Sequence, residues 1–132
     1  LRKFGTAAEL VPPPVLRKAS RSTRFGAIYF GSTSASMHEA LDVLEAEGVF
    51  LDALRLRAFP FAEAVREFIA AHEKVFVVEQ NRDGQMHTLL VNELDLDPAR
   101  LVRVLHFDGT PITARFIAGA IRKNMVWKKE FA

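Results

Sequence analysis

Cysteine is absent from the 132 residues of this chain. That absence excludes disulfide bonds, cysteine-ligated zinc, iron–sulfur ligation and thiol nucleophiles from this polypeptide. Long apolar runs are also missing, since no stretch approaches the ~20 apolar residues of a membrane-spanning helix, and no charged-then-apolar leader is present. We therefore expect a cytoplasmic protein with no membrane partner, whose redox centres, if its function needs any, are supplied by other domains or chains.

A strong net charge is lacking too, because the whole chain carries only +2. The charge is nevertheless unevenly spread. Residues 1–24 carry a net charge of +5 and residues 122–132 a net charge of +3, so residues 25–121 carry a net charge of −6. Basic ends are typical of nucleic-acid arms, but here no interleaved aromatic or RNA-binding signature accompanies them. We expect solvated or partner-facing ends and no nucleic-acid partner.

The hydrophobic fraction of 49% is high enough for one domain of this length to bury a core. Composition predicts three segments: a Pro-rich linker over 1–24, an α/β domain over 25–122 and a basic C-terminal tail over 123–132. Short extended pairing around Leu10–Val11 or Val15–Leu16 stays open. The first residue is Leu1 and not Met, so we expect a fragment of a longer protein.

Four stretches of strand formers alternate with four helical patterns, which predicts a mostly parallel sheet. The predicted strands are 25–30, 51–57, 75–79 and 101–107. Their continuity differs: the run Val75–Val78 has no polar alternation, whereas Arg55 and Arg103 interrupt the second and fourth strands. Unbroken strands belong inside a covered sheet and interrupted strands belong at its rims.

The helical patterns carry apolar residues at intervals of three and four. The first predicted helix carries Met37, Ala40, Leu41 and Leu44 and ends at Gly48. The second runs from Phe61 to about His72, and the third from Met86 to Leu94. The fourth is capped by Thr113 and carries Phe116 to Ile121. Right-handed crossovers then give a three-layer α/β/α sandwich with strand order 2-1-3-4 in chain numbering. The helix of Met37 is predicted on one face, and the helices of Phe61 and Met86 on the other.

Polar groups follow the two central strands where their carboxyl ends meet, and we call this region the crest. In open α/β sheets, ligands and partners usually dock there. The candidate interface residues are Gly31, Ser32, Phe59, Phe61, Glu79, Asn81, Gly84 and Gln85. Glu79 could serve as a general base or accept a partner's hydrogen bond, but no His, Ser or Lys stands beside it. Whether Phe59 and Phe61 dock a partner or fill the core is open.

Other catalytic and metal signatures are weak. The run Gly31–Ser34 precedes a helix but matches neither GxGxxG nor a Walker loop, so a capped turn is favoured over a nucleotide site. His38, His72, His87 and His106 lack metal-site spacing, and we expect each at the surface or a helix end. His106 and Asp108 could meet where the fourth strand ends. We therefore predict no catalytic, cofactor or metal residue in this chain.

Four blocks in sequence resemble a known family: GSTSASMHEALDVLEAEG, LRLRAFPF, VFVVEQNRDGQMHTLL and FDGTPIT. In this order and spacing they resemble the C-terminal domain of the alpha subunit of 2-oxoacid:ferredoxin oxidoreductases, and RKFGTAAELVPPP is similar to the linker before that domain. The resemblance implies a transketolase C-terminal-like fold. Phe30 departs from the family, which has tryptophan or tyrosine there.

The resemblance also implies an activity for the complete enzyme: coenzyme A-dependent oxidative decarboxylation of a 2-oxoacid, most plausibly 2-oxoglutarate, with electrons passed to ferredoxin. Thiamine diphosphate, magnesium and an iron–sulfur cluster are then expected in the beta subunit and other alpha-subunit domains, because this chain lacks the GDG motif and cysteine. Two classes remain open: a non-catalytic assembly domain of that enzyme, or a free-standing α/β module that binds a small anion at Gly31 and Glu79.

Overall fold

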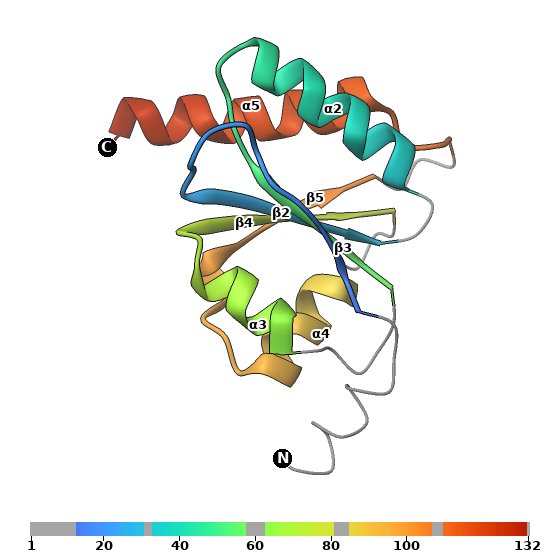
Figure 1. Ribbon diagram of the computed structural model, residues 1–132, viewed down its shortest axis with the longest axis vertical. Coiled ribbons are helices and arrows are strands. Elements are labelled where there is room, and N and C mark those ends of the chain that lie inside the picture. The colour runs from blue at the N-terminus through green and yellow to red at the C-terminus, as the bar shows by residue number, and fades with distance from the viewer. Residues whose placement is uncertain (1–12, 31–32, 58–62, 81–84, 107–109, 132) are drawn as a thin grey trace.

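Strands and helices alternate along the chain in the computed structural model, which describes residues 13–30, 33–57, 63–80, 85–106 and 110–131 (Figure 1). The elements are β1 (Val15–Arg17), β2 (Phe25–Phe30), α2 (Ser34–Ala46), β3 (Asp52–Leu56), α3 (Glu63–Ala70), β4 (Lys74–Glu79), α4 (Gln85–Leu94), the 3-10 helix η2 (Pro98–Arg100), β5 (Leu101–Leu105) and α5 (Ala114–Phe131). None of the described helices is both long and apolar enough to cross a membrane.

The sheet has five strands in the order β1-β3-β2-β4-β5. Strands β3, β2, β4 and β5 run parallel, in the relative order predicted from the sequence, so the α/β fold class is confirmed. Strand β1 pairs antiparallel with β3 from within the segment expected to be a linker, at the position where short pairing around Val15–Leu16 was left open. The described part of that segment is therefore packed against the sheet.

Pairing with β1 changes the setting of β3, which was expected to be an edge strand with one wetter face. Four of its five residues are buried, and only Arg55 is partly exposed. The alternation of Leu and Arg was misleading because a strand from elsewhere in the chain covers this edge. Strand β5 lies at the opposite rim, as its interruption by Arg103 predicted.

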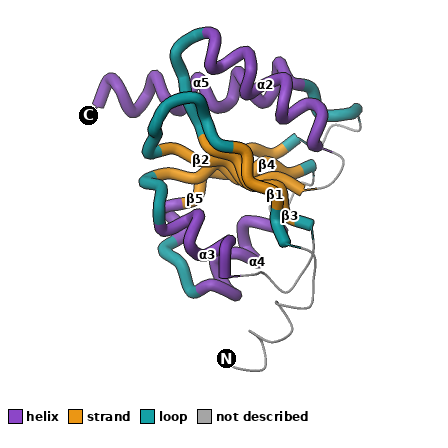
Figure 2. Tube along the Cα trace, viewed as in Figure 1, coloured by secondary structure: helices purple, strands orange, loops and turns teal. Residues whose placement is uncertain are grey.

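Helices cover both faces of the sheet, α2 and α5 on one side and α3 and α4 on the other (Figures 1 and 2). Two apolar clusters fill the layers between them. Ala27 and Tyr29 of β2 point toward α2, whereas Ile28 between them points toward α3, as alternation along a strand requires. The predicted faces of α2, α3 and α4 are confirmed.

The ends of the helices show which sequence signals determine the fold. Helix α2 ends where Gly48 was expected to stop it: Gly48 has φ 88° and its N–H donates to Glu45 O, while Val49 N–H donates to Leu44 O over 2.8 Å. These two bonds form a Schellman motif, which favours glycine at that position. Helix α5, in contrast, continues to Phe131, through the segment 123–132 that was expected to be a tail.

Candidate functional site

Most residues proposed for the crest lie outside the described part of the chain. These are Gly31, Ser32, Phe59, Phe61, Asn81 and Gly84. Glu79 and Gln85 are described, at the end of β4 and the start of α4. The structure thus places these two predicted site residues at the same end of the sheet, as expected from the parallel strands.

Glu79 is buried, with 5% of its surface exposed, and its carboxylate is used within the fold. Oε1 accepts a hydrogen bond from Met86 N over 2.7 Å, and Oε2 accepts one from His87 N over 2.9 Å. These N–H groups belong to the first turn of α4, where an acceptor and a negative charge both stabilise a helix. Glu79 therefore fixes the start of α4, which leaves it poorly placed to act as a general base.

A cavity of about 290 Å³ lies at the crest, and its lining mixes apolar and amide side chains. The lining residues are Phe30, Thr33, Val78, Glu79, Gln80, Gln85, Met86 and Leu89. Phe30 is 44% exposed, although it follows four buried residues of β2. Gln80 Nε2 donates to Thr33 Oγ1 over 3.4 Å and so links the ends of β4 and β2. Such a surface suits contact with polypeptide better than it suits acid–base chemistry.

Three of the four histidines lie at the surface or near a helix end, as expected, but two of these three positions differ in that the side chain is buried. His72 and His87 are buried, with 6% and 5% of their surfaces exposed, whereas His38 is exposed on α2 and His106 is partly exposed. Asp108, the suggested companion of His106, lies outside the described residues. Within the described ranges no group of three His, Cys, Asp or Glu side chains is placed to hold a metal ion.

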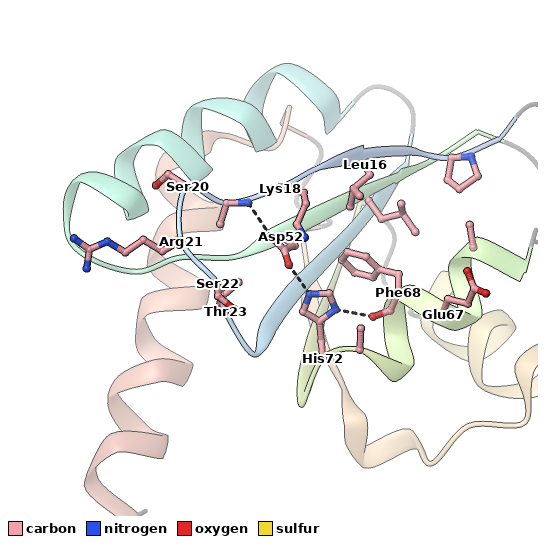
Figure 3. A pocket seen from close by; sticks show the side chains of 15 residues that line it. Leu16, Lys18, Ser20, Arg21, Ser22, Thr23, Asp52, Glu67, Phe68 and His72 are labelled. Atoms are coloured by element: carbon pink, nitrogen blue, oxygen red, sulfur yellow. Dashed lines mark hydrogen bonds and ion pairs between the residues drawn. The ribbon is translucent and has the colours of Figure 1, made fainter.

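His72 forms a buried pair with Asp52 that the sequence analysis did not find (Figure 3). His72 Nε2 lies 2.8 Å from Asp52 Oδ2, and the other carboxylate oxygen, Oδ1, accepts a hydrogen bond from Ala19 N over 2.8 Å. The pair joins the start of β3, the corner between α3 and β4, and the segment between β1 and β2. Asp52 is 20 residues from His72 and 33 residues from Ala19, and no local motif signals contacts of that range.

The Asp52–His72 pair resembles part of a catalytic triad but lacks a free basic nitrogen. His72 Nδ1 lies 2.6 Å from the Phe68 carbonyl oxygen, which can only accept, so Nδ1 carries its proton there. Nε2 faces the carboxylate, and no ring nitrogen is left to take a proton from a substrate. The pair is therefore structural, although a cavity of about 660 Å³ adjoins it.

Close packing of β2 against α3 holds the histidine in place. A Cβ on Gly26 would come within 2.9 Å of two Phe68 ring carbons and 3.2 Å of His72 Cγ. Only glycine allows the ring of Phe68 to lie against β2 this closely. Gly26 thus belongs to the site although it carries no side chain.

Tyr29 and His38 form a second polar contact, on the α2 side of the sheet. The Tyr29 hydroxyl lies 3.0 Å from His38 Nε2, and Tyr29 itself is 2% exposed. Burial raises the pKa of Tyr29, an effect opposed by a hydrogen bond to Ser34 and by the charges of Arg55 and Arg17. The hydroxyl therefore stays protonated at neutral pH and acts as a hydrogen-bonding group.

Comparison with known proteins identifies a sequence relative. The chain is 33% identical over 128 residues to the alpha subunit of 2-oxoacid:ferredoxin oxidoreductase 2 of Aeropyrum pernix. The match covers 92% of this chain but only 19% of the relative, so the chain spans about a fifth of that subunit. No family model matches. The predicted resemblance to these alpha subunits is confirmed.

Solved structures confirm the fold. The 2-oxoglutarate:ferredoxin oxidoreductase from Magnetococcus marinus, solved with 2-oxoglutarate, coenzyme A and succinyl-CoA bound, matches with a TM-score of 0.78 and 22% identity, over 89% of this chain and 20% of that chain. A split-gene transketolase, an inactive beta4 tetramer, matches with a TM-score of 0.67 and 20% identity, over 83% of this chain and 40% of that chain. The predicted transketolase-like fold is therefore present.

Proposed function

We propose, from its kinship with the alpha subunits of 2-oxoacid:ferredoxin oxidoreductases, that this chain is an assembly domain of such a subunit and is not itself catalytic. The complete enzyme converts a 2-oxoacid and coenzyme A to acyl-CoA and carbon dioxide, and passes the electrons to ferredoxin. Its beta subunit and the other alpha-subunit domains are the partners of this chain in the cytoplasm. The observation that carries the proposal is the 33% identity that extends over 92% of the chain.

We propose 2-oxoglutarate as the substrate, because the M. marinus relative was solved with 2-oxoglutarate and succinyl-CoA bound. We also propose that this domain lies at the C-terminal end of the subunit, because the first 24 residues resemble the linker that precedes the family's C-terminal domain.

The residues present do not suit the cofactors of the complete enzyme. An iron–sulfur cluster needs thiolate ligands, and the chain has no cysteine. The magnesium ion that accompanies thiamine diphosphate needs oxygen ligands, but the buried carboxylates of Asp52 and Glu79 are bonded to groups of the fold. Thiamine diphosphate, magnesium and the cluster are therefore assigned to the rest of the enzyme, and no reaction step is assigned to this domain.

A free-standing module that binds a small anion is the alternative. It depended on Gly31 and Glu79, and Gly31 lies outside the described residues. The negative charge of Glu79 would repel an anion, and its oxygens already accept from the backbone of α4. These observations favour the assembly domain.

The first test is the size and activity of the native polypeptide. Mass spectrometry of the source should find peptides of this chain in a subunit several times longer. That subunit, assembled with its beta subunit, should reduce ferredoxin only when both 2-oxoglutarate and coenzyme A are present. A native polypeptide of only this length, with no associated oxidoreductase activity, would contradict the proposal.

A second test concerns this chain by itself. Isothermal titration calorimetry of the 132-residue chain with thiamine diphosphate and magnesium should give no binding heat, because the ligand set is missing. The assembled enzyme is the positive control. Micromolar affinity of the isolated chain would show that the cofactors have been assigned to the wrong domains.

The crest is the proposed contact with the rest of the enzyme. Gln85 is exposed at the start of α4, and it lines the crest cavity. Truncating one side of such a contact costs about 1–3 kcal/mol, so Gln85→Ala or Asn81→Ala should weaken association or turnover while the domain stays folded. Glu39→Ala, at an exposed position of α2, is the control. Normal association of both variants together with failure of Glu39→Ala would place the docking face elsewhere.

A further inference from the structure

Arg55 is a charged residue without a partner inside the sheet. It lies on β3 directly beside Tyr29 of β2 on one side and Val15 of β1 on the other. Its Nε is buried and has no hydrogen-bond partner, and no carboxylate of the described part of the chain forms an ion pair with it. Buried polar groups are nearly always paired, so a guanidinium left in this state indicates a group that the chain itself does not supply.

The side chain of Arg55 lies on the face of the sheet that α2 covers. Ala53, two residues earlier on β3, packs in the same apolar cluster as Tyr29, and residues two apart on a strand point to the same side. Burial is the largest influence on the pKa of Tyr29 and raises it, whereas a hydrogen bond to Ser34 and the charges of Arg55 and Arg17 lower it. The guanidinium of Arg55 is therefore close enough to act on the Tyr29 phenol.

Helix α2 adds a stripe of polar side chains at the same place. Ser34, His38 and Asp42 are four residues apart, so they share one side of α2. Ser34 and His38 both bond with the Tyr29 hydroxyl, the latter through Nε2 over 3.0 Å. One turn further along, Asp42 pairs with Arg17. We call the side chains that gather where α2 begins the Arg55 cluster: Arg55, Tyr29, Ser34 and His38.

The Arg55 cluster carries positive charge that no neighbouring acid balances. The described carboxylates of α2 and β3 are mostly bonded to other groups: Asp42 to Arg17, Glu45 to Ser20, Glu47 to Arg122 and Asp52 to His72. The exception is Glu39, which is exposed and lies beside the stripe, because one residue turns a helix by about 100°. The first turn of α2 contains no acid, and its N-cap Thr33 makes no side-chain cap bond, so the helix end adds to the positive potential.

The cluster is accessible from solvent without any change of fold. His38 is exposed, and Arg55 and Ser34 are partly exposed, whereas Tyr29 forms the buried floor. Strands β2 and β3 and helix α2 hold the four side chains in place before a ligand arrives. A site that is already ordered loses little entropy on binding.

We infer that the Arg55 cluster binds a phosphate group. A carboxylate has two oxygens, which a single guanidinium already satisfies, whereas a phosphate has further oxygens for the hydroxyl and imidazole groups beside Arg55. The site differs from an anion site at Gly31 and Glu79, because Glu79 bonds to α4 on the opposite face of the sheet (Figure 2). The inference goes beyond the proposed assembly role and does not depend on it.

Isothermal titration calorimetry of the 132-residue chain with inorganic phosphate, in a chloride buffer of constant ionic strength, tests the site directly. Arg55→Gln should weaken binding at least about tenfold, because charge-assisted hydrogen bonds are lost. Arg103→Gln is the matched control, since it removes the same charge from an exposed position of β5, the strand at the far rim of the sheet. Its affinity should change less than about twofold, because a distant exposed charge is screened.

Inorganic phosphate and the phosphate groups of a larger molecule share this chemistry, and a parallel titration separates them. Coenzyme A serves as the larger probe. Tighter binding of coenzyme A than of inorganic phosphate, with the same loss in Arg55→Gln, assigns the site to a phosphorylated small molecule. Equal or weaker binding of coenzyme A assigns it to the free ion.

Tyr29 provides a local readout, because it is the only tyrosine of the chain. A phosphate bound beside the phenol opposes its ionisation, so phosphate should move the tyrosinate absorbance titration to higher pH. Chloride at the same ionic strength should not, and neither should phosphate in Arg55→Gln. A role of Arg55 confined to packing would leave the titration unchanged by phosphate.

Absence of binding heat from both ligands, or equal affinity of the wild type and Arg55→Gln, would overturn the inference. If Arg55→Gln does not fold, His38→Ala, at an exposed position, gives the same comparison and should weaken binding at least about threefold. Weaker association of Arg55→Gln with the rest of the subunit, without phosphate binding by the 132-residue chain, would assign Arg55 to a carboxylate of that subunit and also overturn the inference.

Discussion

Two buried carboxylates, at opposite ends of the sheet, can be compared directly. Glu79 ends β4 and Asp52 begins β3, and both are used inside the fold. Glu79 binds backbone groups only 7 and 8 residues further along the chain, whereas the partners of Asp52 are 20 and 33 residues away. The first carboxylate starts a helix, and the second joins three separate segments. Removing each should therefore have different consequences.

The largest effect is expected at Asp52. In Asp52→Ala, His72 Nε2 and Ala19 N both lose their hydrogen-bond partner, which costs about 2–5 kcal/mol in the free energy of unfolding. Urea denaturation at neutral pH measures this loss. Asp42→Ala is the control, because Asp42 is 71% exposed in its pair with Arg17, and an exposed pair contributes at most about 1 kcal/mol. Equal losses in the two variants would contradict the structural role of the buried pair.

The next effect tests the backbone contact beneath the pair. Gly26→Ala places a methyl group within 2.9 Å of Phe68 and should destabilise the domain by about 1–3 kcal/mol, since the ring must move. Gly119→Ala is a matched control: it meets nothing within 4 Å and lies inside α5, where alanine should stabilise by about 0.5–1 kcal/mol. Opposite signs for the two substitutions are the expected result in thermal or urea unfolding.

At the other end of the sheet, Glu79→Gln should have a smaller and more local effect. Glutamine keeps one acceptor oxygen but loses the second acceptor and the charge at the start of α4, which costs about 1–2 kcal/mol. Hydrogen exchange should show faster opening of Met86 and His87 amides than of amides in β2. Uniform acceleration across the sheet would mean that Glu79 acts on the whole fold and that the contrast with Asp52 is wrong.

What could be predicted from the sequence follows the same division between local and distant contacts. The four parallel strands, their relative order and the faces of α2, α3 and α4 were predicted, because periodicity and run length are properties of short windows. The end of α2 at Gly48 was predicted for the same reason.

Distant contacts explain the errors. Strand β1 lies in the segment predicted to be a linker, where pairing around Val15–Leu16 was left open, because three residues after a run of prolines carry no periodicity of their own and are fixed only by pairing with β3. His72 was expected at a surface or helix end, and it does follow α3, but its burial depends on Asp52, Phe68 and Gly26. No window short enough to read as a motif contains these four residues.

The smallest expected effect concerns Tyr29. Its hydroxyl contacts neither Asp52 nor Glu79, so Tyr29 serves as a reference position for the two carboxylates. Tyr29 is the only tyrosine of the chain, so the ultraviolet absorbance of tyrosinate reports its ionisation alone. Burial raises its pKa above the 10.0 of an unperturbed phenol, so above pH 10 the unfolded chain binds fewer protons than the folded chain, and the free energy of unfolding falls as pH rises.

Below pH 10 Tyr29 should add no pH dependence. Tyr29→Phe should lose about 1 kcal/mol at all lower pH values, from the missing hydrogen bond to His38, and should decline less steeply than the wild type above pH 10. Lysines also titrate in this range, and the difference between the two proteins removes their contribution. A folded-state phenol that titrates at or below its value in urea would show that the charges of Arg55 and Arg17 outweigh burial.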